Sequence, residues 1–188
     1  MKKYINTILA NLFRSKRDTL KHDFKRVLPA NEIFTDRWEK AKYLGFGEGT
    51  SVYDSCCVFG DVKVGKNTWI GPFSILDGTG GLTIGSNCSI GSGTHIYTHD
   101  TLMWAVSGGK EKYEYKPVTI GDNIFIAANI IILGGVTVGN QAAILAGAYI
   151  NKNVPERAIM AGNPAKQIGE VVFGADGKPE LMFNKKSE

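Results

Sequence analysis

Residues 118–150 read VTIGDNIFIAANIIILGGVTVGNQAAILAGAYI, and this stretch decides the fold. A large aliphatic side chain returns at every sixth position: Ile120, Ile126, Ile132, Val138, Ile144 and Ile150. A period of six fits neither the 3.6-residue turn of an α-helix nor the plain alternation of a long strand. It indicates short strands joined by tight corners, with one large residue on each strand directed inwards.

The same register starts much earlier in the chain. Eight earlier positions keep the same interval of six, apart from a shift of two residues after the fifth position. They are Val52, Val58, Val64, Ile70, Leu76, Ile84, Ile90 and Ile96. Stacked coils would place like residues over like and build one apolar core that no single repeat can bury. Three hexapeptides would make one triangular coil, so the pattern predicts an all-β core in the form of a parallel β-helix over residues 49–168.

Small residues occupy fixed places within the repeat. Asparagine recurs three positions after the aliphatic residue, at Asn67, Asn87, Asn123 and Asn129. Four positions after it stands a small or β-branched side chain, as at Thr68, Ser74, Cys88, Thr94, Val136, Ala142 and Ala148. Because glycine and asparagine adopt strained corner conformations at low cost, they are expected to form the corners.

Residues 1–48 are predicted to form a separate helical segment. Apolar side chains recur at helical spacing through residues 2–28, with Lys and Arg between them. Pro29 is expected to end that helix, and Asn31 to cap a shorter one that continues through Leu44. Two uses of the first helix stay open, which are packing on the body or a partner subunit and contact with a membrane surface.

The net charge of +4 is unevenly placed. Residues 1–42 hold eleven Lys/Arg against five Asp/Glu, whereas residues 43–188 hold eleven against thirteen. A generally basic nucleic-acid binder is therefore not indicated. Only the N-terminal segment has the charge to meet an anionic surface, so any peripheral membrane contact is expected through residues 1–28.

The sequence predicts a cytoplasmic protein, at the inner face of the membrane if the N-terminal segment binds lipid. No stretch approaches the roughly 18 apolar residues of a membrane span. The start does not read as a signal peptide, because Asn6, Thr7 and Asn11 interrupt its apolar run and no small-residue cleavage site follows. The three cysteines show no metal-ligand spacing and indicate reduced thiols.

Two motifs extend the prediction to a family. Residues 96–100 read IYTHD where the register breaks, and residues 161–166 close the repeats as AGNPAK. Together with the register, they resemble the hexapeptide-repeat acetyltransferases over about residues 50–168. Within that family the sequence is most similar to the sugar and polysaccharide branch, which contains the maltose, galactoside and O-antigen acetylating enzymes. The resemblance implies a left-handed β-helix, a homotrimer with active sites between subunits, acetyl-CoA as acyl donor and no metal.

The resemblance also implies a catalytic histidine. Family members carry it just before or within a loop that projects from the β-helix, and His99 matches this position. The chain has three histidines, of which His95 and His99 lie in the repeats and His22 in the N-terminal segment. His95 stands next to a corner and is a candidate for acceptor binding.

The interruption over residues 100–117 reads DTLMWAVSGGKEKYEYKP and is expected to be a structureless loop. Loops of this length inside a domain usually serve a function or are disordered. Trp104 and Tyr113 are candidates for stacking on a sugar ring, and packing on a neighbouring subunit is the alternative. After Gly169 the resemblance fades, and residues 169–188 are predicted to form a short hairpin or tail.

Coenzyme A contacts follow from the resemblance by position. Ala128, Ala146 and Asn151 would offer backbone groups to the pantetheine arm, while Lys152 and Lys166 would face the phosphates. The sequence departs from its relatives in two places near this groove. Phe125 stands where tryptophan is common, and residues 145–148 read Leu-Ala-Gly-Ala where relatives have Gly-Ala-Gly-Ser.

The implied chemistry needs few groups. His99 would take a proton from the acceptor as it attacks the thioester, because an imidazole titrates near neutral pH. A backbone N–H near Ala128 of a neighbouring chain would stabilise the oxyanion. Asp77, one coil earlier, is the better candidate than Asp100 for orienting the ring. Asp77 is also a candidate for acceptor binding or for a purely structural corner.

Several functions stay open at this stage. The first is O-acetylation of a sugar hydroxyl in a polysaccharide, its lipid-linked precursor or a small saccharide. The second is N-acetylation of a nucleotide-linked amino sugar, although no nucleotide motif is evident. A zinc protein of the γ-carbonic anhydrase type would need a third histidine at a subunit interface, and a non-catalytic scaffold is a further alternative.

Overall fold

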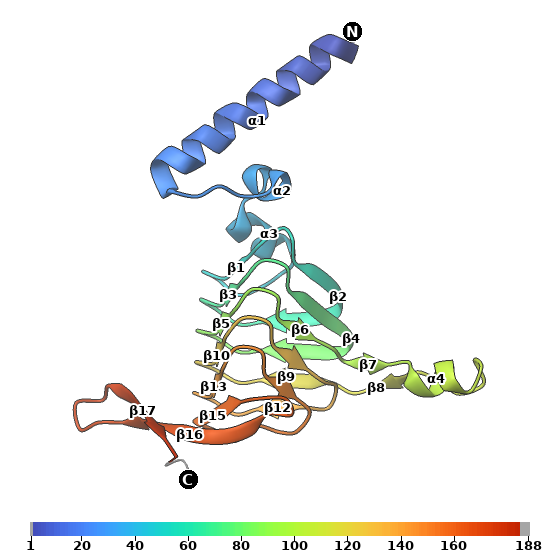
Figure 1. The fold of residues 1–188 in the computed structure, drawn as a ribbon, viewed down its shortest axis with the longest axis vertical. Helices are drawn as coiled ribbons and strands as arrows, with labels where there is room; N and C mark the ends of the chain where they lie inside the picture. The colour runs from blue at the N-terminus through green and yellow to red at the C-terminus, as the bar shows by residue number, and fades with distance from the viewer. Residues whose placement is uncertain (1, 185–188) are drawn as a thin grey trace.

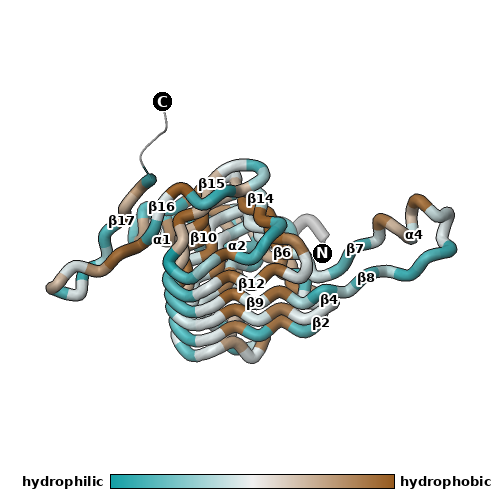
Figure 2. The backbone as a smooth tube through the Cα atoms, turned by 90° about the horizontal axis from the view of Figure 1, so that it is seen from below, coloured by the Kyte–Doolittle hydropathy of each residue, from teal (hydrophilic) through white to brown (hydrophobic). Residues whose placement is uncertain are grey.

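The chain winds into stacked triangular coils whose short strands line up as three flat faces, named here A, B and C (Figures 1 and 2). The computed structural model describes residues 2–184. Face A contains β1 (Ser51–Val52), β3 (Trp69–Ile70), β5 (Ser89–Ile90), β10 (Phe125–Ile126), β13 (Ala143–Ile144) and β15 (Ala158–Ala161). All of these strands pair in parallel with their neighbours.

The other two faces share their first strands. The long strands β2 (Cys57–Val64) and β4 (Ile75–Ile84) begin on face B and bend onto face C. Face B continues with β6 (His95–Ile96), β11 (Ile131–Ile132) and β14 (Tyr149–Ile150). Face C continues with β9 (Val118–Ile120) and β12 (Thr137–Val138), and ends with a bridge from Val138 to Val154.

The sixfold register forms the core, as the sequence predicts. Thirteen of the fourteen aliphatic positions are buried, and Val58 in the first coil is half-buried against the same core. Strand pairing places like over like on each face, for example Ile90 beside Ile126 and Ile126 beside Ile144. The small residues of the repeat are buried as well. The prediction of a hexapeptide β-helix is confirmed.

Asparagine forms corners because it tolerates the left-handed backbone region. The four recurring asparagines all have positive φ, between 52° and 59°. Most other residue types would pay about 1–2 kcal/mol for that conformation, because Cβ crowds the following carbonyl. The sequence position of these asparagines therefore predicted their conformation.

The N-terminal segment is helical, but its division differs from the prediction. It consists of α1 (Lys2–Phe24), α2 (Ala30–Phe34) and α3 (Arg37–Tyr43). The expected single helix from Asn31 is wrong, because Asn31 lies inside α2 and a new helix starts after Asp36. The Asp36 carboxylate accepts hydrogen bonds from the backbone N–H groups of Trp38 and Glu39 at 2.8 and 3.2 Å, which is how an aspartate stabilises a helix start.

Two charged groups, the buried Glu32 and the half-buried Lys40, attach these helices to the first coil. The Glu32 carboxylate accepts hydrogen bonds from the backbone N–H of Asp54 and from both the N–H and the hydroxyl of Ser55. The Lys40 ammonium donates to three backbone carbonyl oxygens of the same coil. These bonds occupy polar backbone groups at the open end of the β-helix, where a stack of strands is otherwise exposed to further pairing.

The interruption is not a structureless loop, so that expectation is wrong. It begins with β7 (His99–Asp100), continues through α4 (Leu102–Val106) and returns along β8 (Glu114–Tyr115). The two strands pair antiparallel, with His99 opposite Tyr115 and Asp100 opposite Glu114. The result is an arm that projects from the β-helix, on the side opposite to the C-terminal hairpin (Figure 2).

The predicted C-terminal hairpin is present. It is formed by β16 (Lys166–Phe173) and β17 (Pro179–Phe183), which pair antiparallel, and β16 also pairs with β15 at the end of face A. Val171 of the hairpin packs with Ala143 and Ile159 in a small apolar cluster outside the main core. Within residues 2–184, no helix has the length and apolar character needed to cross a membrane.

Candidate active site at an irregular corner

One corner of the β-helix departs from the repeat in two successive coils. At the corner between faces B and C, Leu76 and Ile84 lie eight positions apart instead of six, which adds two residues. In the next coil the arm leaves from the same corner, between Ile96 and Ile120. Because Leu76 pairs with Ile96 and Ile84 with Ile120, the enlarged corner and the root of the arm are stacked on each other.

Asp77 and His99 meet at this corner. Asp77 follows Leu76 in the enlarged corner, and His99 is the first residue of the arm. The His99 Nδ1 atom lies 2.6 Å from the Asp77 Oδ2 atom. The Asp77 side chain is 2% exposed and the His99 side chain 35% exposed, so the pair has one buried and one accessible member.

The Asp77 carboxylate is ionised at neutral pH. Burial disfavours its charge, but hydrogen bonds from the Thr79 hydroxyl, the backbone N–H groups of Thr98 and Thr79, and the His99 ring outweigh burial and lower the pKa from 3.8 to about 2. An ionised carboxylate only accepts hydrogen bonds, so His99 must donate from Nδ1. The other ring nitrogen, Nε2, then carries the lone pair that a general base requires.

Thr98 fixes the geometry of this pair. Its backbone N–H donates to the Asp77 carboxylate at 3.0 Å, and its hydroxyl donates to the Asp77 carbonyl oxygen at 2.8 Å. The same hydroxyl accepts from the Gly80 N–H at 2.8 Å. A Cβ on Gly80 would lie only 2.3 Å from the Thr98 carbonyl oxygen, so the corner requires glycine at this position. Thr98 is fully buried, as a positioning residue should be.

A small cavity lies beside His99. It has a volume of about 120 Å³. Its lining comes from the arm and two corners: Tyr97, Thr98, His99, Asp100, Glu114, Lys116, Leu133 and Gly134. The Lys116 ammonium forms an ion pair with the Glu114 carboxylate at 2.5 Å, and this pair raises the pKa of Lys116. The cavity therefore offers the His99 imidazole, the Lys116 ammonium and two carboxylates, those of Asp100 and Glu114.

The arm is also held firmly at Lys116, where the chain returns from β8 to the β-helix. The Lys116 N–H donates to the Thr98 carbonyl oxygen at 2.8 Å, and the Lys116 carbonyl oxygen accepts from the Gly135 N–H at 3.2 Å. A Cβ on Gly134 would come within 3.1 Å of the Lys116 Cβ, so glycine in the next coil makes room for Lys116. Glu114 and Lys116 are thus carried by backbone that is bonded to two coils.

The structure separates the predicted acceptor-binding residues from one another. Asp77 is occupied by His99 and the two threonines. His95 points outward from face B, and its Nδ1 lies 3.4 Å from the Tyr97 hydroxyl. Trp104 and Tyr113 pack edge to face with ring centroids 5.4 Å apart on the arm. Neither lines the cavity beside His99.

The predicted coenzyme A residues fall at two different corners of one chain. Ala128 and Ala146 follow β10 and β13 at the corner between faces A and B, in successive coils. Asn151 and Lys152 follow β14 at the corner between faces B and C, below His99. Lys166 begins β16 and is exposed. One chain therefore does not gather all five residues around His99.

The sequence reasoning missed four residues of this site. Thr79 and Thr98 hold Asp77, while Glu114 and Lys116 line the cavity. The shift of two residues after Leu76 was the available signal, since it enlarges the one corner that stacks on the arm. Among residues 2–184, no group of three or more His, Cys, Asp or Glu side chains is arranged to hold a metal ion.

The fold and this corner define the class of protein, a left-handed β-helix built from hexapeptide repeats. A family model described as the hexapeptide repeat of succinyl-transferase matches residues 61–98 and 117–152, on either side of the arm. The chain carries this hexapeptide repeat on both sides of the arm, and its resemblance to the hexapeptide-repeat acetyltransferases is confirmed.

Two curated relatives from Staphylococcus aureus are similar to part of this chain. Protein CapG of Staphylococcus aureus is 36% identical over 116 residues, covering 56% of this chain and 66% of that protein. A 2,3,4,5-tetrahydropyridine-2,6-dicarboxylate N-acetyltransferase of Staphylococcus aureus strain MRSA252 is 36% identical over 100 residues, covering 53% and 38%. The chain spans about half the length of the curated relatives that it matches, from 38% to 66%.

Solved structures share the fold. A galactoside acetyltransferase in complex with coenzyme A superposes with a TM-score of 0.64 at 22% identity, covering 84% of this chain and 82% of that one. AntD, an N-acyltransferase from Bacillus cereus in complex with dTDP and 3-hydroxybutyryl-CoA, has a TM-score of 0.60 at 21% identity. The match to AntD covers 65% of this chain and 70% of that one.

Proposed function

We propose that the protein is an acetyl-CoA-dependent acetyltransferase that acts on a sugar hydroxyl, with His99 as general base. The acceptor would be a polysaccharide, its lipid-linked precursor or a small saccharide. The observation that carries the proposal is the pairing of His99 Nδ1 with the buried, ionised Asp77 at 2.6 Å, beside a cavity. This pairing orients an imidazole as a base, and the accessible edge of the ring faces away from the carboxylate.

The reaction follows from this geometry. Nε2 of His99 takes the proton of the acceptor hydroxyl while the hydroxyl oxygen attacks the thioester carbonyl carbon. A tetrahedral oxyanion forms, for which the Ala128 N–H of a neighbouring chain is the proposed donor. The carbon–sulfur bond then breaks, the acetyl ester is released, and the imidazolium returns the proton to the departing thiolate of coenzyme A. The charge on Asp77 stabilises the imidazolium between these steps.

We place the coenzyme between two chains of a homotrimer. Ala128 and Ala146 lie across face B from His99, so a groove between neighbouring subunits would bring one chain's alanines to another chain's histidine. Asn151, Lys152 and Lys166 are proposed to complete that groove. Coenzyme A is present in the structure of the galactoside acetyltransferase that shares this fold, which supports the choice of acyl donor.

The outward side chains of the faces support association through face B. Face C presents the polar residues Lys63, Thr83, Thr119 and Thr137. Face B presents Ile75, His95, Ile131 and Tyr149 at the corresponding places. Ile131 is 39% exposed in the single chain, and a second subunit would cover it.

A sugar acceptor would meet charged groups suited to hydroxyls. The Glu114 carboxylate accepts hydrogen bonds and the Lys116 ammonium donates them, so together they can hold neighbouring hydroxyl groups of a ring. Trp104 and Tyr113, which pack on each other further along the arm, remain proposed contacts for a longer saccharide. Their ring faces suit the apolar side of a sugar.

N-acetylation of an amino sugar is the second candidate function. The similarity to the tetrahydropyridine-dicarboxylate N-acetyltransferase and to AntD supports it. The carboxylates of Asp100 and Glu114 would also suit an acceptor that arrives as an ammonium ion, which must lose a proton before it attacks. A γ-carbonic anhydrase function would need zinc ligands from other subunits.

A panel of acceptors tests the proposal. Release of the free thiol of coenzyme A would be followed with galactosides, glucosides, amino sugars and nucleotide-linked amino sugars, each against a deoxy or N-blocked analogue. We expect turnover with hydroxyl acceptors and its loss when the reacting hydroxyl is removed. Turnover restricted to free amines would replace the first function with the second. Stoichiometric zinc with no thiol release from any acceptor would contradict both.

A further inference from the structure

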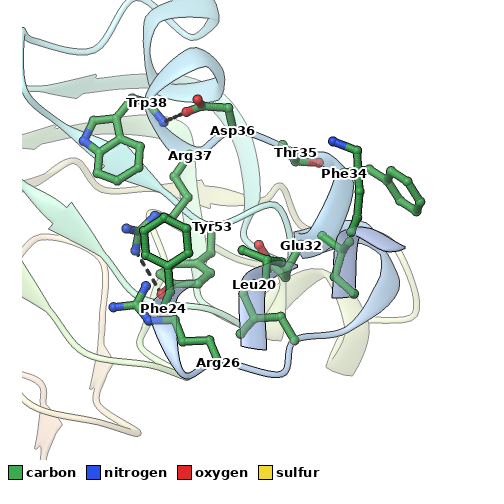
Figure 3. Close-up of a pocket in the computed structure, with 13 residues that line it drawn as sticks. Leu20, Phe24, Arg26, Glu32, Phe34, Thr35, Asp36, Arg37, Trp38 and Tyr53 are labelled. Atoms are coloured by element: carbon green, nitrogen blue, oxygen red, sulfur yellow. Dashed lines mark hydrogen bonds between the residues drawn. The ribbon is translucent and has the colours of Figure 1, made fainter. Parts of the chain in front are cut away.

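The two halves of α1 have different surroundings. In the C-terminal half, Leu20 and Phe24 point toward α2 and α3 and border a cavity of about 310 Å³ together with Phe34 and Tyr53 (Figure 3). Phe13 also packs on Phe34, with ring centroids 6.3 Å apart. This half is therefore tied to the body through the helices that close the first coil.

The N-terminal half stands away from the body (Figure 1), and it keeps an apolar face exposed. Its large side chains lie on one side of the helix at the spacing i, i+1, i+4, i+5 and i+8. They are Tyr4, Ile5, Ile8, Leu9 and Leu12, which are 46–72% exposed. A contiguous apolar face on a projecting helix is a contact surface, since exposure of this kind is costly in water.

The charge of this half identifies the partner. Residues 1–17 contain five Lys/Arg and no Asp or Glu, and the first acidic residue is Asp18. The basic side chains of Arg14, Lys16 and Arg17 follow directly after the apolar face. A second copy of the same helix would bring like charges together, whereas a surface of anionic phospholipid complements both the charge and the apolar face.

We propose that residues 4–12 of α1 lie on an anionic phospholipid bilayer, with the apolar face inserted among the lipid chains and the basic residues that follow, Arg14, Lys16 and Arg17, on the headgroups. The helix lies on the membrane instead of crossing it, because no helix of residues 2–184 is long and apolar enough to span a bilayer. The anchored half of α1 then holds the β-helix at the membrane surface. This inference does not depend on the chemistry at His99.

Co-sedimentation of the full chain with vesicles tests this proposal. We expect the wild-type chain to sediment with vesicles of phosphatidylcholine and phosphatidylglycerol, and at least about tenfold less with phosphatidylcholine alone. The double variant Ile8→Glu/Leu9→Glu should lose the binding to the mixed vesicles. The double variant Arg14→Gln/Lys16→Gln keeps the apolar face and should lose most of the preference for the anionic lipid.

A matched control separates this surface from exposed apolar residues in general. Leu181 and Met182 on β17 are 57% and 60% exposed, so the variant Leu181→Glu/Met182→Glu should bind vesicles as the wild type does. Circular dichroism and thiol release would show that the variants are folded. Equal sedimentation of the wild type and Ile8→Glu/Leu9→Glu would overturn the proposal. So would a loss of trimer mass in light scattering for that variant in the absence of vesicles, because the face would then bind another copy.

Discussion

The corner between faces B and C is irregular in the second and third coils, but it is regular in the fourth coil. In the fourth coil, Ile132 and Val138 keep the interval of six, and the corner contains only the short sequence Leu-Gly-Gly-Val-Thr. In the earlier coils the same corner holds the added residues after Asp77 and the arm that starts at His99. The regular corner supplies only Leu133 and Gly134 to one wall of the cavity, whereas the irregular corners supply the base and the carboxylate that orients it. Repetition builds the core of this protein, and departures from repetition build its site.

Removal of the base should have the largest effect. His99→Ala is expected to lower kcat by about 10²- to 10⁴-fold, the range for a lost general base, while the melting temperature changes little. Turnover would be followed by thiol release. His22→Ala is the matched control, because His22 is exposed on α1 and should be silent. Turnover of His99→Ala within twofold of wild type would show that another group is the base.

Truncation of a core side chain should lower the stability of the fold and leave the acetyl transfer reaction itself unaffected. Ile120→Ala removes a side chain that is 1% exposed and is expected to lower the free energy of unfolding by about 2–5 kcal/mol. Its neighbour Thr119 points outward from the same strand, so Thr119→Ala should cost less than about 0.5 kcal/mol. Urea unfolding measures both. Similar losses for the two variants would mean that the register does not define the core.

Asp77→Asn tests the carboxylate that orients His99. An amide can donate to Nδ1 and so favours the tautomer with its proton on Nε2, which cannot act as a base. We expect kcat to fall by up to about 10⁴-fold with an unchanged KM for acetyl-CoA. Wild-type kcat in this variant would leave Asp77 as a structural residue of the corner.

The same substitution should change the stability in acid. Because folding lowers the pKa of Asp77 from 3.8 to about 2, its ionised form stabilises the fold fully above about pH 4, and this contribution is lost as the pH falls through 2. The contribution is on the order of 2 kcal/mol. Asp77→Asn should therefore be less stable than wild type at neutral pH and should lack this loss between pH 4 and pH 2 in urea unfolding.

Glu114→Gln tests the cavity wall. The substitution keeps the shape but removes the charge that pairs with Lys116, so we expect the KM for the acceptor to rise by about tenfold with the KM for acetyl-CoA unchanged. Asp61→Asn is the control, since Asp61 and Lys63 form an exposed ion pair at the same sequence spacing, 3.2 Å apart, on β2. Equal acceptor KM values in the two variants would remove Glu114 from the site.

Corner conformation should have the smallest effect. Asn129 has a φ of 59°, so Asn129→Ala is expected to destabilise the fold by about 1 kcal/mol, and Asn129→Gly to leave it nearly unchanged. Thermal unfolding of the two variants measures the difference. If alanine and glycine are equivalent at this position, the corner does not select for the left-handed conformation.

The sequence by itself determined the β-helix, its core and its corners, because these depend on residues that are close in the chain and on a period that repeats. Val58 alone among the fourteen aliphatic positions is only half-buried, although Val52 and Val64 of the same first coil are buried. The IYTHD motif singled out His99 differently, through its resemblance to the hexapeptide-repeat acetyltransferases. The helix boundaries around Asp36 were less predictable, because two residues of similar capping strength lie five positions apart.

Only the tertiary structure decided which groups meet. Asp77 and His99 are 22 positions apart, and their contact exists because one full coil brings the enlarged corner under the root of the arm. The four supporting residues, Thr79, Thr98, Glu114 and Lys116, contact the pair or the cavity through stacking and strand pairing that no local pattern encodes. A repeat fixes what is regular from the sequence alone, but a site at its interruption depends on contacts between coils.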